Sequence, residues 1–289
     1  MEQRDLTSTF RDQLSESEGS KLPSLMDIPD EKNANHAGGH SFQRVLLRFV
    51  FKGKGRSLNQ AENSAELLQA AVQWIDGLID LDEKGIIHRD ISYGNLLLPS
   101  ESGGAKIIDL GLSHLKNAAK SIKEFASDDD ENYDEAISGC PHAHHHITGT
   151  LPFVAHDLLY ALWRAQSCEH TLYHDVESIF WVLLYVCLKE HGGPMAGIWT
   201  DVLSSLTSSE IGAVVTQKNM CLTKEGFYNN IGGKFGDLEG FFSGYYDIYR
   251  WHGKEVAKDT ATRVRNLALS ELQKILASQV TNEQKIHPS

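Results

Sequence analysis

The residues with the clearest capacity for chemistry lie between positions 88 and 111. An H-R-D-x-x-x-x-N pattern begins at His88 and places Asp90 five residues before Asn95, and the triplet Asp109-Leu110-Gly111 follows two isoleucines. Phosphoryl transfer needs a carboxylate that orients the attacking hydroxyl, and oxygen ligands that hold magnesium against the phosphates. Asp90, Asn95 and Asp109 supply such a set, so this spacing predicts a site for phosphoryl transfer.

Two segments farther along the chain follow these residues in a recognisable order. The first is G-T-L-P-F-V-A-H-D from Gly149 to Asp157, and the second is D-V-E-S from Asp175 to Ser178, which opens an apolar stretch. An isolated H-R-D could be a surface turn, but these motifs occur together and in kinase order. The sequence therefore resembles the protein kinases over about residues 44–188. HRDIS-x-GN, G-T-L-P-F-V-A and H-D-x-E-S make it similar to the fungal-type protein kinase family in particular.

The resemblance implies a role for each matching residue. Asp90 would be the catalytic base, and Asn95 and Asp109 would hold Mg²⁺ against the phosphates of ATP. Arg89 would pair with a phosphate on the activation loop. Asp175 would brace the backbone of the catalytic loop, a role compatible with capping its own helix. The implied catalytic residues are His88, Arg89, Asp90 and Ser92, and the implied nucleotide-binding residues are Asn95, Asp109 and Gly111.

Several features depart from the kinase pattern. No G-x-G-x-x-G loop and no V-A-I-K-like lysine precede His88, and residues 1–43 lack strand patterning, so we expect a truncated N-terminal lobe. Ser92 stands where serine/threonine kinases usually carry a lysine that contacts the γ-phosphate. ATP would lose contacts to its phosphates and its adenine, so we expect this chain to be catalytically impaired.

Three functions stay open at the level of sequence. The first is ATP-dependent phosphoryl transfer to serine or threonine of a protein substrate, which the family resemblance implies. The second is a non-catalytic, pseudokinase-type module that binds partner proteins, which the missing glycine loop and lysine favour. The third is transfer to a small molecule by a related fold, which shares H-x-D-x-x-x-x-N but which the segment from Gly149 to Asp157 disfavours.

Local patterning predicts the elements that position these residues. Between Asn63 and Leu81 apolar residues recur every three or four positions, with Asn63 and Glu66 spaced like a capping box, which predicts an amphipathic helix. Positions 174–189 are apolar on nearly all sides, which predicts a buried helix. We expect short strands at 44–51, 86–87, 96–98 and 107–108. The predicted fold class is α+β, a protein-kinase-like, mainly helical C lobe with short strands.

Composition divides the chain into segments. We expect a disordered polar tail at 1–43, a protein-kinase-like domain at 44–280 and a C-terminal tail at 281–289. Within the domain, residues 116–148 are expected to form a long polar insertion in the activation segment. The C-terminal part of the domain is expected to form helices and to end in an amphipathic segment over 261–276.

The insertion also contains a group of potential zinc ligands. The group consists of Cys140, His142, His144, His145 and His146. Imidazole and thiolate suit zinc, but structural zinc sites normally place their ligands on a defined turn. A solvated loop with partly protonated imidazoles is therefore the favoured interpretation, and the role of the acidic and His-rich insertion stays open.

Charge and composition disfavour several classes of protein. The 289 residues include 27 Lys and Arg against 39 Asp and Glu, a net charge of −12, which disfavours binding to nucleic acid or to an anionic membrane. The four cysteines form no C-x-x-C pair, which disfavours a disulfide framework. The most apolar stretch, 179–188, is about half the length that crosses a bilayer, and no signal-peptide pattern is present. These features predict an intracellular protein, cytoplasmic or nuclear, and leave its oligomeric state open.

Overall fold

The computed structural model describes six ranges of the chain. They are residues 55–101, 103–116, 149–190, 196–229, 231–252 and 257–286, with side chains described except at 250–252, 257 and 282–286. The predicted tail at 1–43 and the predicted strand at 44–51 lie outside the described residues. Positions 117–148 of the predicted insertion also lie outside them, including its acidic run Asp128–Glu131 and its group of potential zinc ligands.

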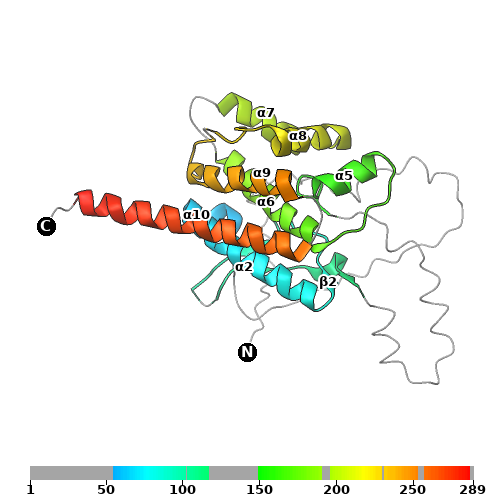
Figure 1. Ribbon diagram of the computed structural model, residues 1–289, viewed down its shortest axis with the longest axis horizontal. Helices are drawn as coiled ribbons and strands as arrows, with labels where there is room; N and C mark the ends of the chain where they lie inside the picture. The colour runs from blue at the N-terminus through cyan, green and yellow to red at the C-terminus, as the bar shows by residue number, and fades with distance from the viewer. Residues whose placement is uncertain are drawn as a thin grey trace, which may run out of the picture.

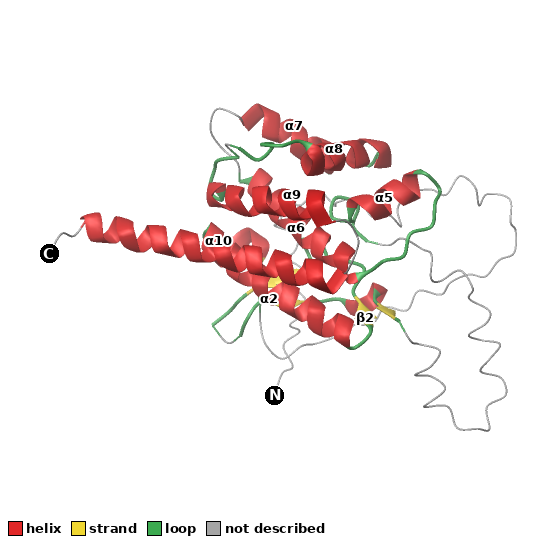
Figure 2. Cartoon of the chain, viewed as in Figure 1, coloured by secondary structure: helices red, strands yellow, loops and turns green. Residues whose placement is uncertain are grey.

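Helices make up most of the described chain, and the strands are short (Figures 1 and 2). The α-helices are α2 (Ser64–Glu83), α5 (His156–Trp163), α6 (Leu172–Lys189), α7 (Ala196–Leu206), α8 (Ile211–Thr223), α9 (Glu239–His252) and α10 (Ala257–Ile286). The strands are β1 (Arg56–Ser57), β2 (Ile86–Ile87), β3 (Leu96–Leu98), β4 (Lys106–Ile107) and β5 (His114–Leu115). The short 3₁₀ turns are η2 (Leu58–Gln60), η3 (Leu110–Leu112) and η4 (Gly236–Leu238). The mixed, mainly helical class predicted from the sequence is confirmed.

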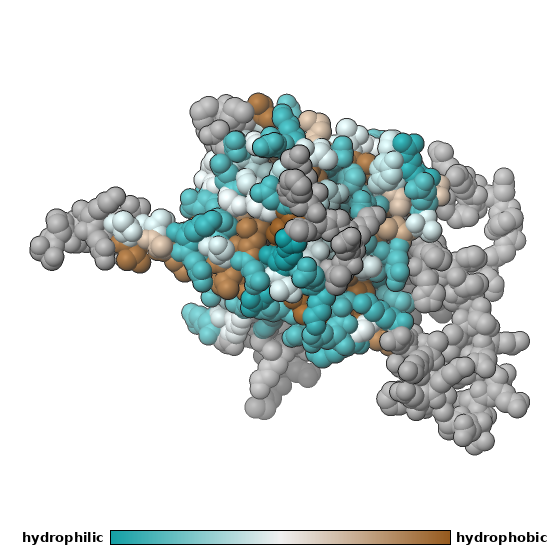
Figure 3. Space-filling model, viewed as in Figure 1, coloured by the Kyte–Doolittle hydropathy of each residue, from teal (hydrophilic) through white to brown (hydrophobic). Residues whose placement is uncertain are grey.

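The helices stack around α6. Figure 1 shows α10 lying along α2, and both of these helices contact α6 on one side. On the other side α6 contacts α7, which packs on α8, and α8 in turn contacts α5 and α9. The C-terminal end of α10 extends beyond the body of the molecule, and the space-filling view shows apolar side chains on it (Figure 3). Leu276 and Val280 of α10 (Ala257–Ile286) are exposed.

The strands form two small antiparallel sheets. In the first, β3 pairs with β1 and with β4, with Leu96 opposite Ile107. In the second, β2 pairs with β5, with Ile86 opposite Leu115. The loop between β2 and β3 therefore has both ends held by strands. The segment after β4 starts beside that loop, because β4 is hydrogen-bonded to β3.

Helix α2 forms for the local reasons that its sequence indicates. The Asn63 side chain accepts the Glu66 backbone N–H at 2.9 Å, and the Glu66 carboxylate in turn accepts the N–H of Glu62 at 2.8 Å. The helix ends at Glu83, and Gly85 then adopts the left-handed region with φ 75°. Its apolar face is buried against α6 and α10. The predicted amphipathic helix is confirmed and is two residues longer than expected.

Helix α6 is buried on nearly all sides, as its sequence predicts. It begins two residues earlier than expected, because Thr171 caps it through a capping box with His174. Near its middle the Phe180 ring stacks on the Tyr245 ring of α9, with ring centroids 4.2 Å apart. The helix is therefore fixed in the interior, where its first turns can serve as a rigid support for the loops around them.

Helix α10 is longer than the amphipathic segment predicted at 261–276. It continues to Ile286, past the domain boundary expected at 280. Arg265 on α10 forms a two-pronged ion pair with Asp76 on α2, at 2.5 and 3.2 Å, which ties the two helices together across the surface. Among the helices of the described residues, none is long and apolar enough to cross a membrane.

Candidate active site

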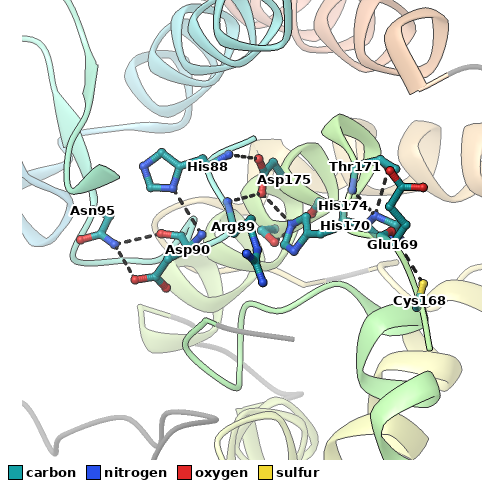
Figure 4. A network of polar contacts seen from close by, with 11 residues as sticks. His88, Arg89, Asp90, Asn95, Cys168, Glu169, His170, Thr171, His174 and Asp175 are labelled. Atoms are coloured by element: carbon teal, nitrogen blue, oxygen red, sulfur yellow. Dashed lines mark hydrogen bonds and ion pairs between the residues drawn. The ribbon is translucent and has the colours of Figure 1, made fainter. Parts of the chain in front are cut away.

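The loop of residues 88–95 joins β2 to β3 and carries most of the predicted site residues (Figure 4). The His88 side chain is fully buried within this loop. Its Nδ1 accepts the Asp90 backbone N–H at 3.3 Å, and its Nε2 lies 3.1 Å from the Ile108 carbonyl oxygen. These two contacts assign the ring proton to Nε2. The His88 ring thereby ties the loop to the end of β4.

Asp175, near the start of α6, holds the backbone of the same loop from the other side (Figure 4). Its carboxylate accepts the His88 N–H at 2.8 Å and the Arg89 N–H at 3.1 Å. The N-cap of α6 is Thr171, so Asp175 reaches the loop from inside the helix. Arg89 has φ 70°, a rare conformation for a residue with a side chain. The two bonds to Asp175 stabilise this strained backbone.

His170 gives the Asp175 carboxylate a third contact. The His170 Nε2 lies 2.8 Å from Asp175 Oδ1, and Asp175 is only 1% exposed. Burial alone would raise the pKa of Asp175, but the His170 imidazole and the His88 N–H outweigh burial and hold this pKa below its usual value. The carboxylate therefore stays ionised and keeps its hold on the loop.

Asp90 receives hydrogen bonds from two directions. The Asn95 amide nitrogen donates to the Asp90 carbonyl at 2.9 Å and to its carboxylate at 3.0 Å, and the Thr150 hydroxyl donates to Asp90 Oδ1 at 3.3 Å. Burial raises the pKa of Asp90; His88 and the bonds from Thr150 and Asn95 oppose this rise, and Asp109 adds to it. A half-buried carboxylate with a raised pKa is suited to accept a proton during catalysis.

Asp109 follows β4 on a backbone segment bonded to the 88–95 loop. The Ile108 N–H donates to the Asn95 carbonyl at 2.9 Å, which places Asp109 one residue from that contact. Asp109 adopts φ 65°, and its Oδ1 accepts the Gly111 N–H at 3.1 Å. Its side chain is exposed. The fold thus brings Asn95 and Asp109 onto adjoining segments, although 14 positions separate them in sequence.

Asn95 and Asp109 offer oxygen donors of the kind that Mg²⁺ prefers. Because the amide nitrogen of Asn95 points to Asp90, the amide oxygen points away from it (Figure 4). In the part of the chain that the structure describes, no group of three or more His, Cys, Asp or Glu side chains could hold a metal ion. Mg²⁺ needs only one or two protein oxygens when phosphates and water supply the rest. The pair therefore fits a magnesium–nucleotide complex.

The segment that begins at Gly149 closes one side of the site. Gly149 has φ 126°, and a Cβ there would lie 2.9 Å from Val154 Cγ2 and 3.3 Å from the Arg89 carbonyl oxygen. Only glycine fits this position without strain. Because Gly149 packs closely against Val154 and the Arg89 backbone, the next residue, Thr150, lies within hydrogen-bonding distance of Asp90. The close packing at Gly149 and the hydrogen bond from Thr150 to Asp90 thus account for the Gly-Thr pair of the sequence motif.

Two buried ionisable side chains, Lys218 and Glu177, hold this segment by hydrogen bonds to its backbone. The Lys218 ammonium on α8 donates to the Val154 carbonyl at 2.5 Å, and Glu177 on α6 accepts the His156 N–H at 2.7 Å. Both side chains are fully buried, and Lys218 Nζ lies 4.1 Å from the centre of the Trp181 ring. Burial lowers the pKa of Lys218 to about 7, whereas the Glu177 carboxylate opposes that change. Burial also raises the pKa of Glu177.

The structure brings the predicted residues of the 88–95 loop together with Asp109 and Asp175. Ser92 is buried, and its carbonyl accepts the Asn95 N–H at 3.1 Å, so it shapes the loop. Sequence reasoning missed the contacts made by His170, Glu177 and Lys218. The sequence carried one signal for Glu177, a second carboxylate two positions after Asp175 at the start of a largely apolar segment.

Comparisons with known proteins agree with the predicted resemblance. A family model described as fungal protein kinase matches residues 2–187. Over 57 residues, or 20% of this chain, the sequence is 47% identical to serine/threonine-protein kinase STK11 of Homo sapiens, and it is equally similar to the Gallus gallus protein of the same name. The matched segment spans only 12% and 11% of these two proteins.

Proposed function

The chain belongs to the fungal protein kinase family, and we propose that it transfers a phosphoryl group from ATP to a serine or threonine hydroxyl of a protein substrate. The observation that carries this proposal is the convergence of Asn95 and Thr150 on Asp90. Phosphoryl transfer depends mainly on positioning and on electrostatic stabilisation. The hydrogen bonds from Asn95 and Thr150 hold the Asp90 carboxylate in one position, which satisfies the need for positioning.

In the proposed reaction Asp90 orients the acceptor hydroxyl. The hydroxyl donates its hydrogen bond to the Asp90 carboxylate, which accepts the proton as the oxygen bonds to the γ-phosphorus and ADP leaves. The raised pKa of Asp90 favours that transfer. The hydrogen bonds from Asn95 and Thr150 keep the carboxylate in one orientation. His88, Arg89 and Ser92 act through the backbone of the loop.

The nucleotide side of the site consists of Asn95, Asp109 and Gly111. We propose that the amide oxygen of Asn95 and the carboxylate of Asp109 hold Mg²⁺, which when bound neutralises charge on the ATP phosphates. The Gly111 N–H keeps Asp109 in place by binding one of its carboxylate oxygens. Because the Asp109 side chain is exposed, it is accessible to a nucleotide.

We also propose that this chain catalyses the reaction slowly. The sequence before His88 contains no G-x-G-x-x-G loop and no V-A-I-K-like lysine, and Ser92 provides no cation for the γ-phosphate. The same absence favours a second candidate, a non-catalytic module that binds partner proteins through the kinase fold. The two candidates differ in whether phosphate is transferred.

Thermal unfolding with nucleotide tests the metal site. Saturating ATP should raise the Tm only when Mg²⁺ is present, and a ligand at 100 times its Kd stabilises a protein by about 2.7 kcal/mol. Asp109→Ala should abolish the rise. Asp201→Ala, which removes an exposed aspartate on α7, should keep it. A rise that survives Asp109→Ala would contradict the assignment.

Transfer of labelled phosphate to a mixture of serine and threonine peptides tests the chemistry. Wild-type chain should label peptide, and Asp90→Asn, which keeps the size but loses the base, should not. Binding of Mg–ATP without any transfer by the wild-type chain would instead support the binding module.

A further inference from the structure

A hollow lies beside the 88–95 loop, at the C-terminal end of α6. Its lining residues are Leu58, Asn59, Tyr93, Val186, Lys189, Glu190, Lys234 and Phe235. Tyr93 belongs to the loop that carries Asp90, and Lys189 ends α6. We call this feature the Lys189 hollow. It is separate from the nucleotide side of the site, because none of Asn95, Asp109 and Gly111 lines it.

Aromatic rings hold the Lys189 ammonium at the hollow. The Nζ atom lies 5.4 Å from the centre of the Tyr93 ring and 5.6 Å from that of Tyr185. The two rings meet edge to face, with centroids 5.4 Å apart. Such contacts orient a cation without neutralising it. Lys189 therefore presents a positioned positive charge.

The cations of the hollow have no anionic partner in the described chain. Lys116, Lys258 and Lys274 each form an ion pair within the described residues. Lys189 and Lys234 are both exposed and belong to none of these pairs. With Glu190 as the one acidic lining residue, the hollow carries two positive charges and one negative charge. This positive excess contrasts with the net charge of −12 on the whole chain.

Tyr93 adds a hydrogen-bond donor to these charges. Tyr93 lines the hollow, and the phenolic hydroxyl of a tyrosine carries its proton at neutral pH. A protonated phenol can donate to a carboxylate. The ammonium groups of Lys189 and Lys234 and the hydroxyl of Tyr93 therefore favour binding of an anionic side chain over a cationic one.

The hollow is within reach of a peptide bound at Asp90. Tyr93 follows Asp90 by three residues, so at most about 11 Å of backbone separates them. An extended peptide advances about 3.3 Å per residue, so this span corresponds to about three residues of substrate. The Phe153 ring packs on Tyr185 at 5.3 Å, which joins the hollow to the segment that carries Thr150.

We propose that the Lys189 hollow binds an acidic side chain of the protein substrate, two to four residues from the acceptor hydroxyl. The proposal rests on the protein substrate in the proposed function and adds the chemistry by which that substrate is chosen. Charge complementarity favours this occupant, because Lys189 and Lys234 lack acidic partners in the described chain.

Zero-length cross-linking tests the contact directly. The probe is a serine peptide with blocked termini and glutamate as its only acid, placed two to four residues from the serine on either side. Carbodiimide should join this glutamate to Lys189 or Lys234, as mapped by mass spectrometry of the full chain. Cross-links only to other lysines would overturn the proposal. So would an intramolecular link from either lysine to the acidic run Asp128–Glu131 with no peptide bound, because the chain itself would then fill the hollow.

Charge variants test the selectivity. The double variant Lys189→Gln and Lys234→Gln should weaken binding of the glutamate peptide about fivefold by fluorescence anisotropy, as expected for two exposed ion pairs. It should leave a matched glutamine peptide unchanged. The control Lys84→Gln and Lys224→Gln has the same net charge and should bind both peptides like wild type. Equal losses in the two double variants would show a general charge effect and would refute the subsite.

These measurements need no phosphate transfer, so they separate the two proposals. Glutamate-selective binding at the hollow without labelling of any peptide would keep the subsite and reject the catalytic function. Labelling of serine peptides with no preference between glutamate and glutamine would keep the catalytic function and reject the subsite.

Discussion

Replacement of Lys218 by methionine tests whether a buried ammonium holds the segment that closes the site. Lys218 is fully buried and donates at 2.5 Å to the Val154 carbonyl. Methionine has a similar length and fills the same space, so packing alone should cost less than about 1.5 kcal/mol. The loss of the donor leaves a buried carbonyl unsatisfied, at about 1–3 kcal/mol. It also removes the positive charge that acts on the buried Glu177 carboxylate. Leaving a buried charge without this compensation adds to the cost, so we expect about 3 kcal/mol in total at pH 7, where Lys218 is about half protonated.

The loss should increase with pH. The pKa of Lys218 is about 7 in the folded chain and 10.5 for an ordinary lysine. Between these values the unfolded chain binds the proton and the folded chain does not, so this group makes wild-type stability rise with pH, and Lys218→Met lacks that rise. The pKa of Glu177 is raised by burial, so its contribution falls as pH rises through that pKa. Above pH 7 wild-type Lys218 has also lost its charge, so the contribution of Glu177 is similar in the two proteins, and the Lys218 contribution widens the difference.

Chemical denaturation at pH 7, 8 and 9 measures these differences. The double variant Lys218→Met and Glu177→Gln should be more stable than Lys218→Met alone, because glutamine can accept the His156 N–H without a buried charge. Lys224→Met, at an exposed position just past α8, should stay within about 0.5 kcal/mol of wild type. A loss below about 1 kcal/mol for Lys218→Met, or a loss that shrinks as pH rises, would refute the reasoning.

Three further variants probe the site and its supports. Thr150→Val removes a hydrogen bond that lowers the pKa of Asp90, so the pKa of Asp90 should rise. The fall in phosphate-transfer activity on the acidic side of the pH–rate profile should then occur at a higher pH than in wild type, and an unchanged profile would contradict this. Gly149→Ala places a Cβ 2.9 Å from Val154 Cγ2 at φ 126° and should cost about 1–3 kcal/mol in urea denaturation, and a neutral effect would show that the segment relaxes easily. Asn63→Ala removes the cap of α2 and should cost about 1 kcal/mol by the same method, whereas Asn63→Ser should recover most of it.

The features that the sequence predicted are those determined by neighbouring residues. Helix α2 was predictable because its cap and its apolar spacing are local, and the buried character of α6 follows from the apolar residues around its whole circumference. The strand expected at 107–108 lies instead at Lys106–Ile107. The Ile108 N–H still donates to the Asn95 carbonyl, and these two residues are opposite each other in the β3–β4 register, so the pairing extends one residue beyond the strand.

The contacts that the sequence could not provide join distant positions. Asp175 lies 87 residues from His88, and Lys218 lies 64 residues from Val154, and no local pattern specifies either pairing. The role of Asp175 was expected only through the family resemblance. Lys218 resembles an ordinary solvent-facing lysine until α8 is packed against the Gly149 segment.

The two supports of the site have a common origin on α6. Asp175 and Glu177 are two positions apart, and side chains with this spacing point to different faces of a helix. One carboxylate binds the 88–95 loop and the other binds the segment that carries Thr150, and the loop and segment meet again where Thr150 contacts Asp90. A rigid, buried helix therefore sets the distance between both sides of the site. This arrangement explains why two carboxylates occur in the first turns of a buried helix despite the cost of burying them.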